Sequence, residues 1–158
     1  MNEENETKVH VDEPVDEPKD LWGNIPDPAP DPTPRAILRE QADLLSSRTN
    51  QVLLGVVKAN TNPGNELWAT LSIRAPFLNK YEIDLIDIAH PILIYPVTVY
   101  SKFLTLPEAE RPERAGFVEL PSITCNNREE FVRAVANVLQ SEEVHKIIGA
   151  LLTQSKSP

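Results

Sequence analysis

The sequence of 158 residues has a single cysteine, Cys125, and only three histidines. One cysteine cannot form an intramolecular disulfide, and it cannot alone supply a structural zinc site, which needs four ligands. The five glycines do not occur at the GxGxxG or GxxxxGK spacing that holds phosphates, and the GxSxG and HExxH motifs of hydrolases are absent. The sequence therefore lacks the recognisable nucleotide, disulfide and zinc signatures.

Long apolar segments are also lacking. The longest, Ile92–Tyr100, contains Pro96 and falls far short of the ~20 residues that span a bilayer. The N-terminus, Met-Asn-Glu-Glu-Asn-Glu, has neither the basic region nor the apolar region of a secretory signal. We therefore expect a soluble, cytoplasmic protein.

Residues 1–33 carry nearly all of the charge imbalance. They include ten acidic residues, two lysines and six prolines, which leaves the rest of a chain of net charge −9 almost neutral. Prolines and like charges oppose regular structure, and few apolar residues are present to offset the entropy lost on ordering. We predict a disordered acidic, proline-rich tail at 1–33 and a single domain at 34–158. The acidic balance disfavours direct binding to nucleic acid or to an anionic membrane.

One apolar group interrupts the acidic tail, and it consists of Leu21, Trp22 and Ile25. Tryptophan is enriched where protein interfaces are strongest, and an exposed indole in a flexible segment is costly to leave in water. These three residues are therefore the candidate partner-binding residues of a docking motif. The alternative is that Trp22 folds back onto the protein's own domain, since a short connection makes self-docking cheap in entropy.

Apolar periodicity indicates one helix and then a group of strands after the tail. Thr33 is a good N-cap and Pro34 a favoured first residue for a helix that should end near Ser47. The expected strands span residues 51–59, 67–74, 81–88 and 92–100, with a short fifth strand at 116–120 as an option. Gly55 in the first strand suggests a bulge or a close contact. Pro96 in the fourth suggests an edge strand or a bulge, and an exposed edge there would leave homodimerisation open.

Two amphipathic helices are expected at the C-terminal end. Asn126 and Glu129 resemble a capping box for the first helix, and Ser141 can cap the second. His145 lies beside the apolar stripe of the second helix and is expected at the boundary with solvent. Because the strands follow one another without alternating helices, they favour an antiparallel sheet. The predicted fold is α+β, with a four- or five-stranded antiparallel sheet packed by one N-terminal and two C-terminal helices.

Candidate catalytic and metal-binding residues are few. Cys125 stands just before a predicted helix N-terminus, which can lower a thiol pKa, but an isolated cysteine is more often a packing residue. Asp84, Asp87 and His90 are close in sequence, yet alternation along a strand keeps Asp84 and Asp87 on opposite faces unless a bulge intervenes. Glu82 and Asp84 share a face, although a solvated strand face explains two carboxylates as well as a magnesium or acid–base site does. We therefore expect no catalytic residue, no metal and no cofactor.

The sequence favours a small non-enzymatic protein-interaction protein, such as an adaptor, an accessory subunit or the neutralising partner of another bacterial-type protein. One alternative is an acidic inhibitor that mimics nucleic acid, although most of the charge lies in the flexible tail. Another is an enzyme or a small-molecule binder, which would need a deep apolar pocket lined by Trp68, Tyr95 or Tyr100. The charged segment 106–116 is either a recognition loop or a connector.

Overall fold

The structure is a computed structural model that describes residues 19–61, 64–112 and 119–156. Contacts between Cα atoms divide the chain into one unit that ends at Pro30 and another that begins at Asp31. The predicted disorder of residues 1–18 and the start of the optional strand at 116–120 lie outside the described residues. The fold described below is that of the second unit.

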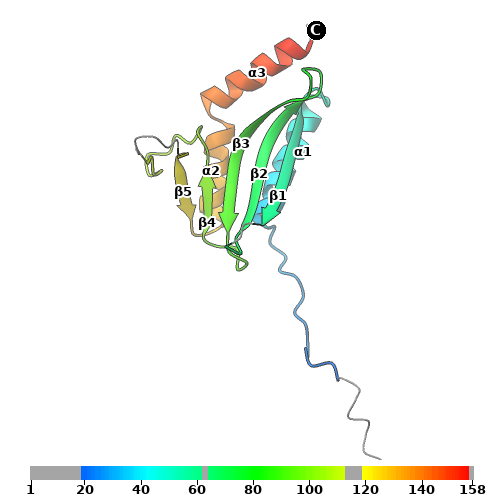
Figure 1. The fold of residues 1–158 in the computed structure, drawn as a ribbon, viewed down its shortest axis with the longest axis vertical. Coiled ribbons are helices and arrows are strands. Elements are labelled where there is room, and N and C mark those ends of the chain that lie inside the picture. The colour runs from blue at the N-terminus through cyan, green and yellow to red at the C-terminus, as the bar shows by residue number, and fades with distance from the viewer. Residues whose placement is uncertain (1–18, 62–63, 113–118, 157–158) are drawn as a thin grey trace, which may run out of the picture. The chain divides into compact units, whose positions relative to one another are not determined.

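The described residues of the second unit form three helices and five strands (Figure 1). Their order along the chain is α1 (Pro34–Arg48), β1 (Leu54–Thr61), β2 (Leu67–Ala75), β3 (Tyr81–His90), β4 (Val97–Tyr100), β5 (Ser122–Cys125), α2 (Arg128–Leu139) and α3 (Glu142–Lys156). The strands form one antiparallel sheet in the order β1-β2-β3-β4-β5. This confirms the predicted α+β fold class with one N-terminal and two C-terminal helices.

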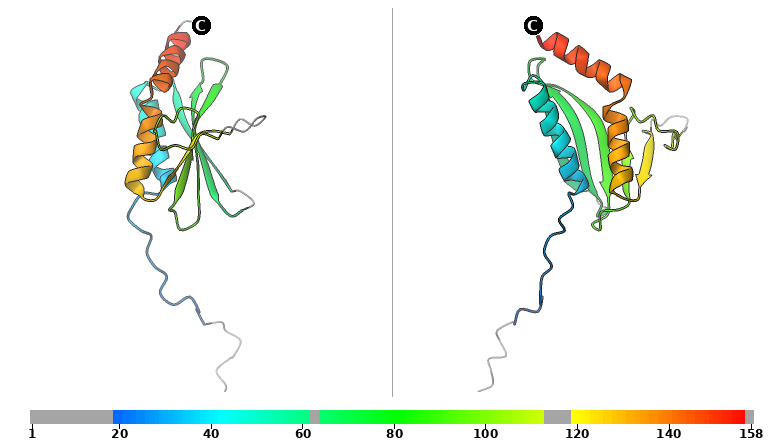
Figure 2. Two further views of the ribbon diagram at one scale, coloured as in Figure 1. Left: turned by 90° about the vertical axis from the view of Figure 1, so that its left-hand side faces the viewer. Right: turned by 180° about the vertical axis from the view of Figure 1, so that it is seen from behind.

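The helices lie on one face of the sheet, and none of the described helices covers the opposite face, as the edge-on view in Figure 2 shows. α1 packs on β1 and β2, whereas α2 packs on β3, β4 and β5. α3 follows α2 and lies across the end of the two-helix layer. We call the helix-covered side the inner face and the opposite side the outer face.

The hydrophobic core lies between the inner face and the helices. Leu38 of α1, Ile73 and Ile88 of the sheet, and Phe131 of α2 are completely or almost completely buried in it. These residues come from the apolar stripes of the helices and from alternate positions of the strands, so burial follows the two periodicities read in the sequence.

The first strand begins later than the sequence predicts, at Leu54 instead of residue 51. Asn50 and Gln51 have φ angles of 51° and 65°, which are incompatible with extended backbone. The Gln51 N–H donates to the Ser46 carbonyl at 2.8 Å, so these residues continue the turn that ends α1. The apolar run alone gives no sign of this turn.

The fourth strand is shorter than predicted, and it is not an edge strand. Val97–Tyr100 lies between β3 and β5, so the outermost strands of the sheet are β1 and β5. The Ile94 N–H donates to the Pro91 carbonyl at 2.9 Å in a turn that includes the first half of the predicted strand. Pro96 stands just before β4, where its missing donor interrupts no ladder. The fifth strand is Ser122–Cys125, which begins after the optional strand at 116–120, and Glu119 and Leu120 do not belong to a strand.

Candidate functional site

A β-bulge at Leu85 decides which side chains of β3 reach the outer face. Leu71 pairs with Ile86 and Ser72 pairs with Asp84, so Leu85 has no partner residue on β2. An extra residue of this kind reverses the alternation of faces beyond it. Asp84 and Asp87 therefore share the outer face. The sequence predicted that Asp84 and Asp87 could share a face only if a bulge lay between them, and the structure contains that bulge.

Both aspartates are engaged by hydroxyl groups of the neighbouring strand. The Ser72 hydroxyl donates to Asp84 Oδ1 at 2.6 Å, and the Thr70 hydroxyl donates to Asp87 Oδ1 at 2.6 Å. Hydrogen bonds from hydroxyl to carboxylate across a strand pair stabilise the pairing register. This arrangement accounts for the two aspartates without a bound ion.

Glu82 continues the row of carboxylates on the outer face. It accepts hydrogen bonds from Lys58 on β1 and from Arg74 Nε on β2, the latter at 3.1 Å. The hydrogen bond from Lys58 is the main cause that holds the pKa of Glu82 below its ordinary value, and burial opposes it. Glu82 is therefore a charged cross-strand link between three strands.

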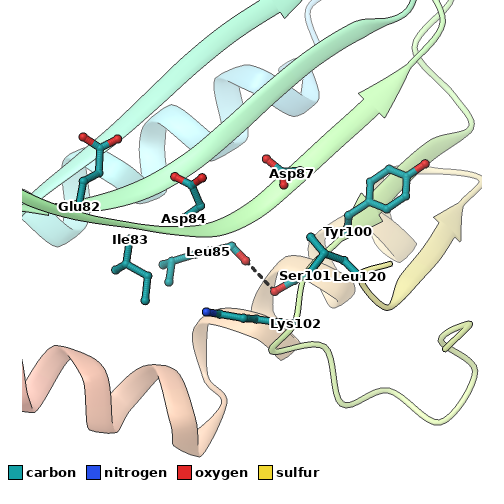
Figure 3. A pocket seen from close by; sticks show the side chains of 9 residues that line it. All are labelled: Glu82, Ile83, Asp84, Leu85, Asp87, Tyr100, Ser101, Lys102 and Leu120. Atoms are coloured by element: carbon teal, nitrogen blue, oxygen red, sulfur yellow. Dashed lines mark hydrogen bonds between the residues drawn. The ribbon is translucent and has the colours of Figure 1, made fainter. Parts of the chain in front are cut away.

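The outer face also contains a hollow of about 440 Å³ beside β3 and the end of β4 (Figure 3). Glu82, Asp84 and Asp87 line it on one side, and Ser101 lies on the other. The Ser101 hydroxyl donates to the Leu85 carbonyl at 2.6 Å and accepts from the Phe103 N–H at 3.1 Å. Since Ser101 is buried and both of these bonds are structural, it supports the bulge and is not placed as a nucleophile.

His90 does not join the two aspartates. Its pairing with Leu67 places it on the inner face, whereas Asp87 is on the outer face. Its Nδ1 atom lies 2.8 Å from the Pro91 carbonyl oxygen. In the described part of the chain, no three or more His, Cys, Asp and Glu side chains gather in a way that could hold a metal ion.

The aromatic residues proposed for a ligand pocket do not form one together. The rings of Trp68 and Tyr100 stack on each other, with centroids 5.6 Å apart and planes at 14°. Tyr95 packs against the core. Of the three, only Tyr100 lines the hollow on the outer face.

Cys125 is fully buried at the end of β5. Burial is the main cause that raises the pKa of its thiol to about 11, and the charge of Glu130 adds to the effect. The helix begins only at Arg128, and desolvation outweighs any effect of its N-terminus. The structure thus speaks against an activated thiol, because burial moves the pKa of Cys125 further from neutrality instead of toward it.

The described part of segment 106–116 is attached to the domain. Glu110 exchanges two backbone hydrogen bonds with Ser122 of β5, and Arg111 Nη2 donates to the Leu104 carbonyl at 2.9 Å. Leu106 is buried. Residues 106–112 therefore lie against the domain, where Glu110 pairs with the first residue of β5, and residues 113–116 lie outside the described part. The choice between a recognition loop and a connector stays a prediction.

The candidate partner-binding residues are the most exposed apolar residues of their segment. Leu21 is 90% exposed, Trp22 is 82% exposed and Ile25 is 72% exposed. The Trp22 N–H donates to Asp20 Oδ1 at 3.0 Å, and Gly23 follows with a φ of 63°. The local backbone thus makes a turn that a side chain at Gly23 would disfavour.

The helices enclose a second apolar surface, which the sequence does not predict. A groove of about 720 Å³ lies between α1 and α2, with α3 along one end, and we call it the helix-side groove. Leu44 of α1 and Val132 of α2 line it and are 46% and 43% exposed. Leu44 and Val132 belong to the apolar stripes of amphipathic helices, and such stripes ordinarily face the core. The spacing of apolar residues along a helix does not determine the distance between two helices that pack on the same sheet. The groove could therefore not be predicted from the sequence.

Comparisons of the chain with protein-family models, with curated proteins and with solved structures found no match. None of the helices in the described residues has the length and apolar content that crossing a bilayer requires.

Proposed function

We propose that this protein acts by binding another protein through the segment Leu21–Ile25. The observation that carries the proposal is the exposure of Leu21, Trp22 and Ile25 at 90%, 82% and 72%, within five residues of one another. Large apolar side chains are rarely grouped on the surface of a soluble protein without an interaction that covers them. Aromatic anchors such as tryptophan commonly supply most of the binding energy at an interface.

The charge around the segment indicates the chemistry of the partner. Asp20, Asp27 and Asp31 flank the three apolar residues, and Lys19 is the only nearby cation. An apolar cleft surrounded by lysine and arginine would match this pattern, since complementary charge steers association and favours the correct partner. Binding should therefore weaken as the salt concentration rises.

The backbone turn supports the same proposal. The hydrogen bond from the Trp22 N–H to Asp20 restricts the residues before the indole, and a segment that is already restricted loses less entropy when it binds. Asp20 would then have two roles, one in the turn and one in the charge pattern.

The proposal is tested by affinity capture with the full chain as bait. Replacing Leu21, Trp22 and Ile25 by serine should remove the main captured protein, as measured by quantitative mass spectrometry. The matched control replaces Ile92 and Leu93, which are 75% and 85% exposed in the turn before β4, and it should leave capture unchanged. A synthetic peptide of residues 19–33 should compete for the purified partner. Equal capture by the serine variant and the native chain would refute the proposal.

A further inference from the structure

All three helices contribute to the helix-side groove. His145, Ile148, Gly149 and Leu152 of α3 line it and recur at the spacing of one helix face. Gly149 is the small residue of this face, and a Cβ atom there would meet no atom within 4 Å. The groove therefore has free space where a longer side chain on α3 would fill it.

The walls of the groove are apolar and open to water. Leu44 and Val132, on opposite walls, are 46% and 43% exposed. The floor consists of Leu71, Ile73 and Leu85 from the inner face of the sheet. A volume of about 720 Å³ falls within the about 300–1,000 Å³ typical of small-molecule sites.

The charge of the lining differs from that of the whole chain. The chain has 24 acidic residues against 15 lysines and arginines, yet the groove lining includes Arg48 and His145 and no carboxylate. None of the ion pairs formed among the described residues uses Arg48. Arg48 ends α1 and His145 lies in the first turns of α3, so these two basic groups belong to the part of the groove that α3 closes. The uncharged polar lining residues are Gln41, Thr49 and Gln140.

We infer that the helix-side groove binds an amphipathic anion with a single hydrocarbon chain. The chain lies between Leu44 and Val132 over the apolar floor, and the acidic group faces Arg48 and His145. Most of the lining is apolar, so a hydrocarbon chain fits the centre of the groove better than a fully polar ligand does. The Arg48 guanidinium forms no ion pair with a described residue, and the described lining contains no carboxylate, which favours a negative headgroup over a neutral or positive one.

The site is tested by titrating the full chain with sodium dodecanoate in a calorimeter, below the concentration at which the detergent forms micelles. The native chain should bind about one equivalent. Gly149→Leu fills the free space on α3 and should weaken binding at least tenfold. Gly149→Ala adds only a Cβ atom in open space, so it is the matched control and should bind like the native chain.

The headgroup contact is tested separately with Arg48→Gln. This variant should weaken dodecanoate binding about two- to fivefold, the range expected for an ion pair at an exposed position. The binding of dodecanol, which has the same chain and no charge, should not change. Replacing Leu21, Trp22 and Ile25 by serine should leave dodecanoate binding intact, so failure here and failure of the proposed protein-binding function can be told apart.

Three results would overturn the inference. The first is an absence of dodecanoate binding by the native chain, including the case in which an apolar helical peptide binds instead. The second is equal binding by Gly149→Leu and Gly149→Ala, which would place the ligand elsewhere. The third is equal weakening of dodecanoate and dodecanol by Arg48→Gln, which would remove the headgroup contact.

Discussion

Gly55 of β1 lies so close to Ala42 of α1 that a Cβ atom on Gly55 would stand 2.3 Å from the Ala42 Cα atom. At the same place the Gly55 N–H donates to the Ser46 hydroxyl at 2.9 Å, and that hydroxyl donates to the Ala42 carbonyl at 3.0 Å. The contact between α1 and the sheet thus depends on a missing side chain and on one hydroxyl group. The sequence suggested a bulge or a close contact at Gly55, and the uninterrupted register with β2 shows that it is the contact.

Gly55→Ala is therefore expected to destabilise the domain. The added methyl group meets backbone atoms that cannot rotate away, so α1 must move, at a cost of roughly 1–3 kcal/mol or more. Urea denaturation followed by circular dichroism measures the change. Gly149→Ala is the control, since its Cβ atom meets nothing within 4 Å and alanine should stabilise α3 by about 0.5–1 kcal/mol. Similar stabilities for the two variants would contradict the close contact.

The cap of α2 gives a second prediction. Asn127 Oδ1 accepts the Glu130 N–H at 2.9 Å, and the Glu130 carboxylate accepts the Asn126 N–H. Asn127→Ala should therefore cost about 1 kcal/mol, as the loss of an N-cap side chain does. Asn126→Ala should change the free energy of unfolding little, because Asn126 contributes its backbone and not its side chain. If the Asn126 variant were the less stable of the two, the cap would be the residue that the sequence suggested.

The elements that could be predicted are those with a strong local signal. Thr33 and Pro34 start α1 as expected, and the Thr33 hydroxyl accepts the Ala36 N–H. The errors lie where tertiary pairing decides. Asn126 and Asn127 are both good caps, and the choice between them depends on where β5 ends. Whether Pro96 lies inside a strand or just before it likewise depends on how the neighbouring strands pair with this segment. The sequence of the segment alone does not determine that pairing.

The outer face shows an error of another kind at the candidate site. The sequence placed Asp84 and Asp87 on opposite faces, and Leu85 reverses that assignment because it bulges. The sequence did carry a signal for the bulge, because two consecutive apolar residues, Leu85 and Ile86, interrupt the alternation of polar and apolar residues along the strand. Both residues are buried. The exposed residues Leu21, Trp22 and Ile25 were easier to find, because a group of apolar residues in an acidic segment is visible in composition alone.

The third prediction concerns pH. The pKa of Glu82 is lower than its ordinary value of 4.5, mainly through the hydrogen bond from Lys58. A carboxyl group with a lowered pKa in the folded state stabilises the fold above its unfolded pKa, and this contribution disappears as the pH falls through the folded pKa. Glu82→Gln should therefore be less stable than the native chain at pH 7, by at most about 1 kcal/mol for a partly exposed group. The difference in free energy of unfolding between Glu82→Gln and the native chain should disappear as the pH falls below 4.5.

Urea denaturation at a series of pH values measures this difference for Glu82→Gln. Glu142→Gln is the control, because Glu142 and Lys146 form an ion pair with side chains that are 85% and 75% exposed. The effect of Glu142→Gln at pH 7 should be smaller than that of Glu82→Gln, because the pair is exposed and only the weak attraction of the α3 N-terminus for the Glu142 charge is added. Addition of 1 M salt should narrow the Glu82→Gln difference at pH 7. A constant difference from pH 7 to pH 3 would show that the charge of Glu82 does not stabilise the sheet.

The final prediction concerns the thiol of Cys125. Its pKa is about 11 against an ordinary 9.0, so at pH 8 the folded protein should have about a hundredfold less thiolate than an exposed cysteine. Burial slows the reaction further, since the side chain is 0% exposed. An aromatic disulfide reagent should thus label native Cys125 much more than a hundredfold slower than the urea-unfolded chain. A Cys125→Ser, Gln154→Cys variant supplies an exposed thiol on α3 as the control, and it should react quickly in both states. Rapid labelling of native Cys125 would mean that the end of β5 opens to solvent, and the thiol would again be a candidate nucleophile.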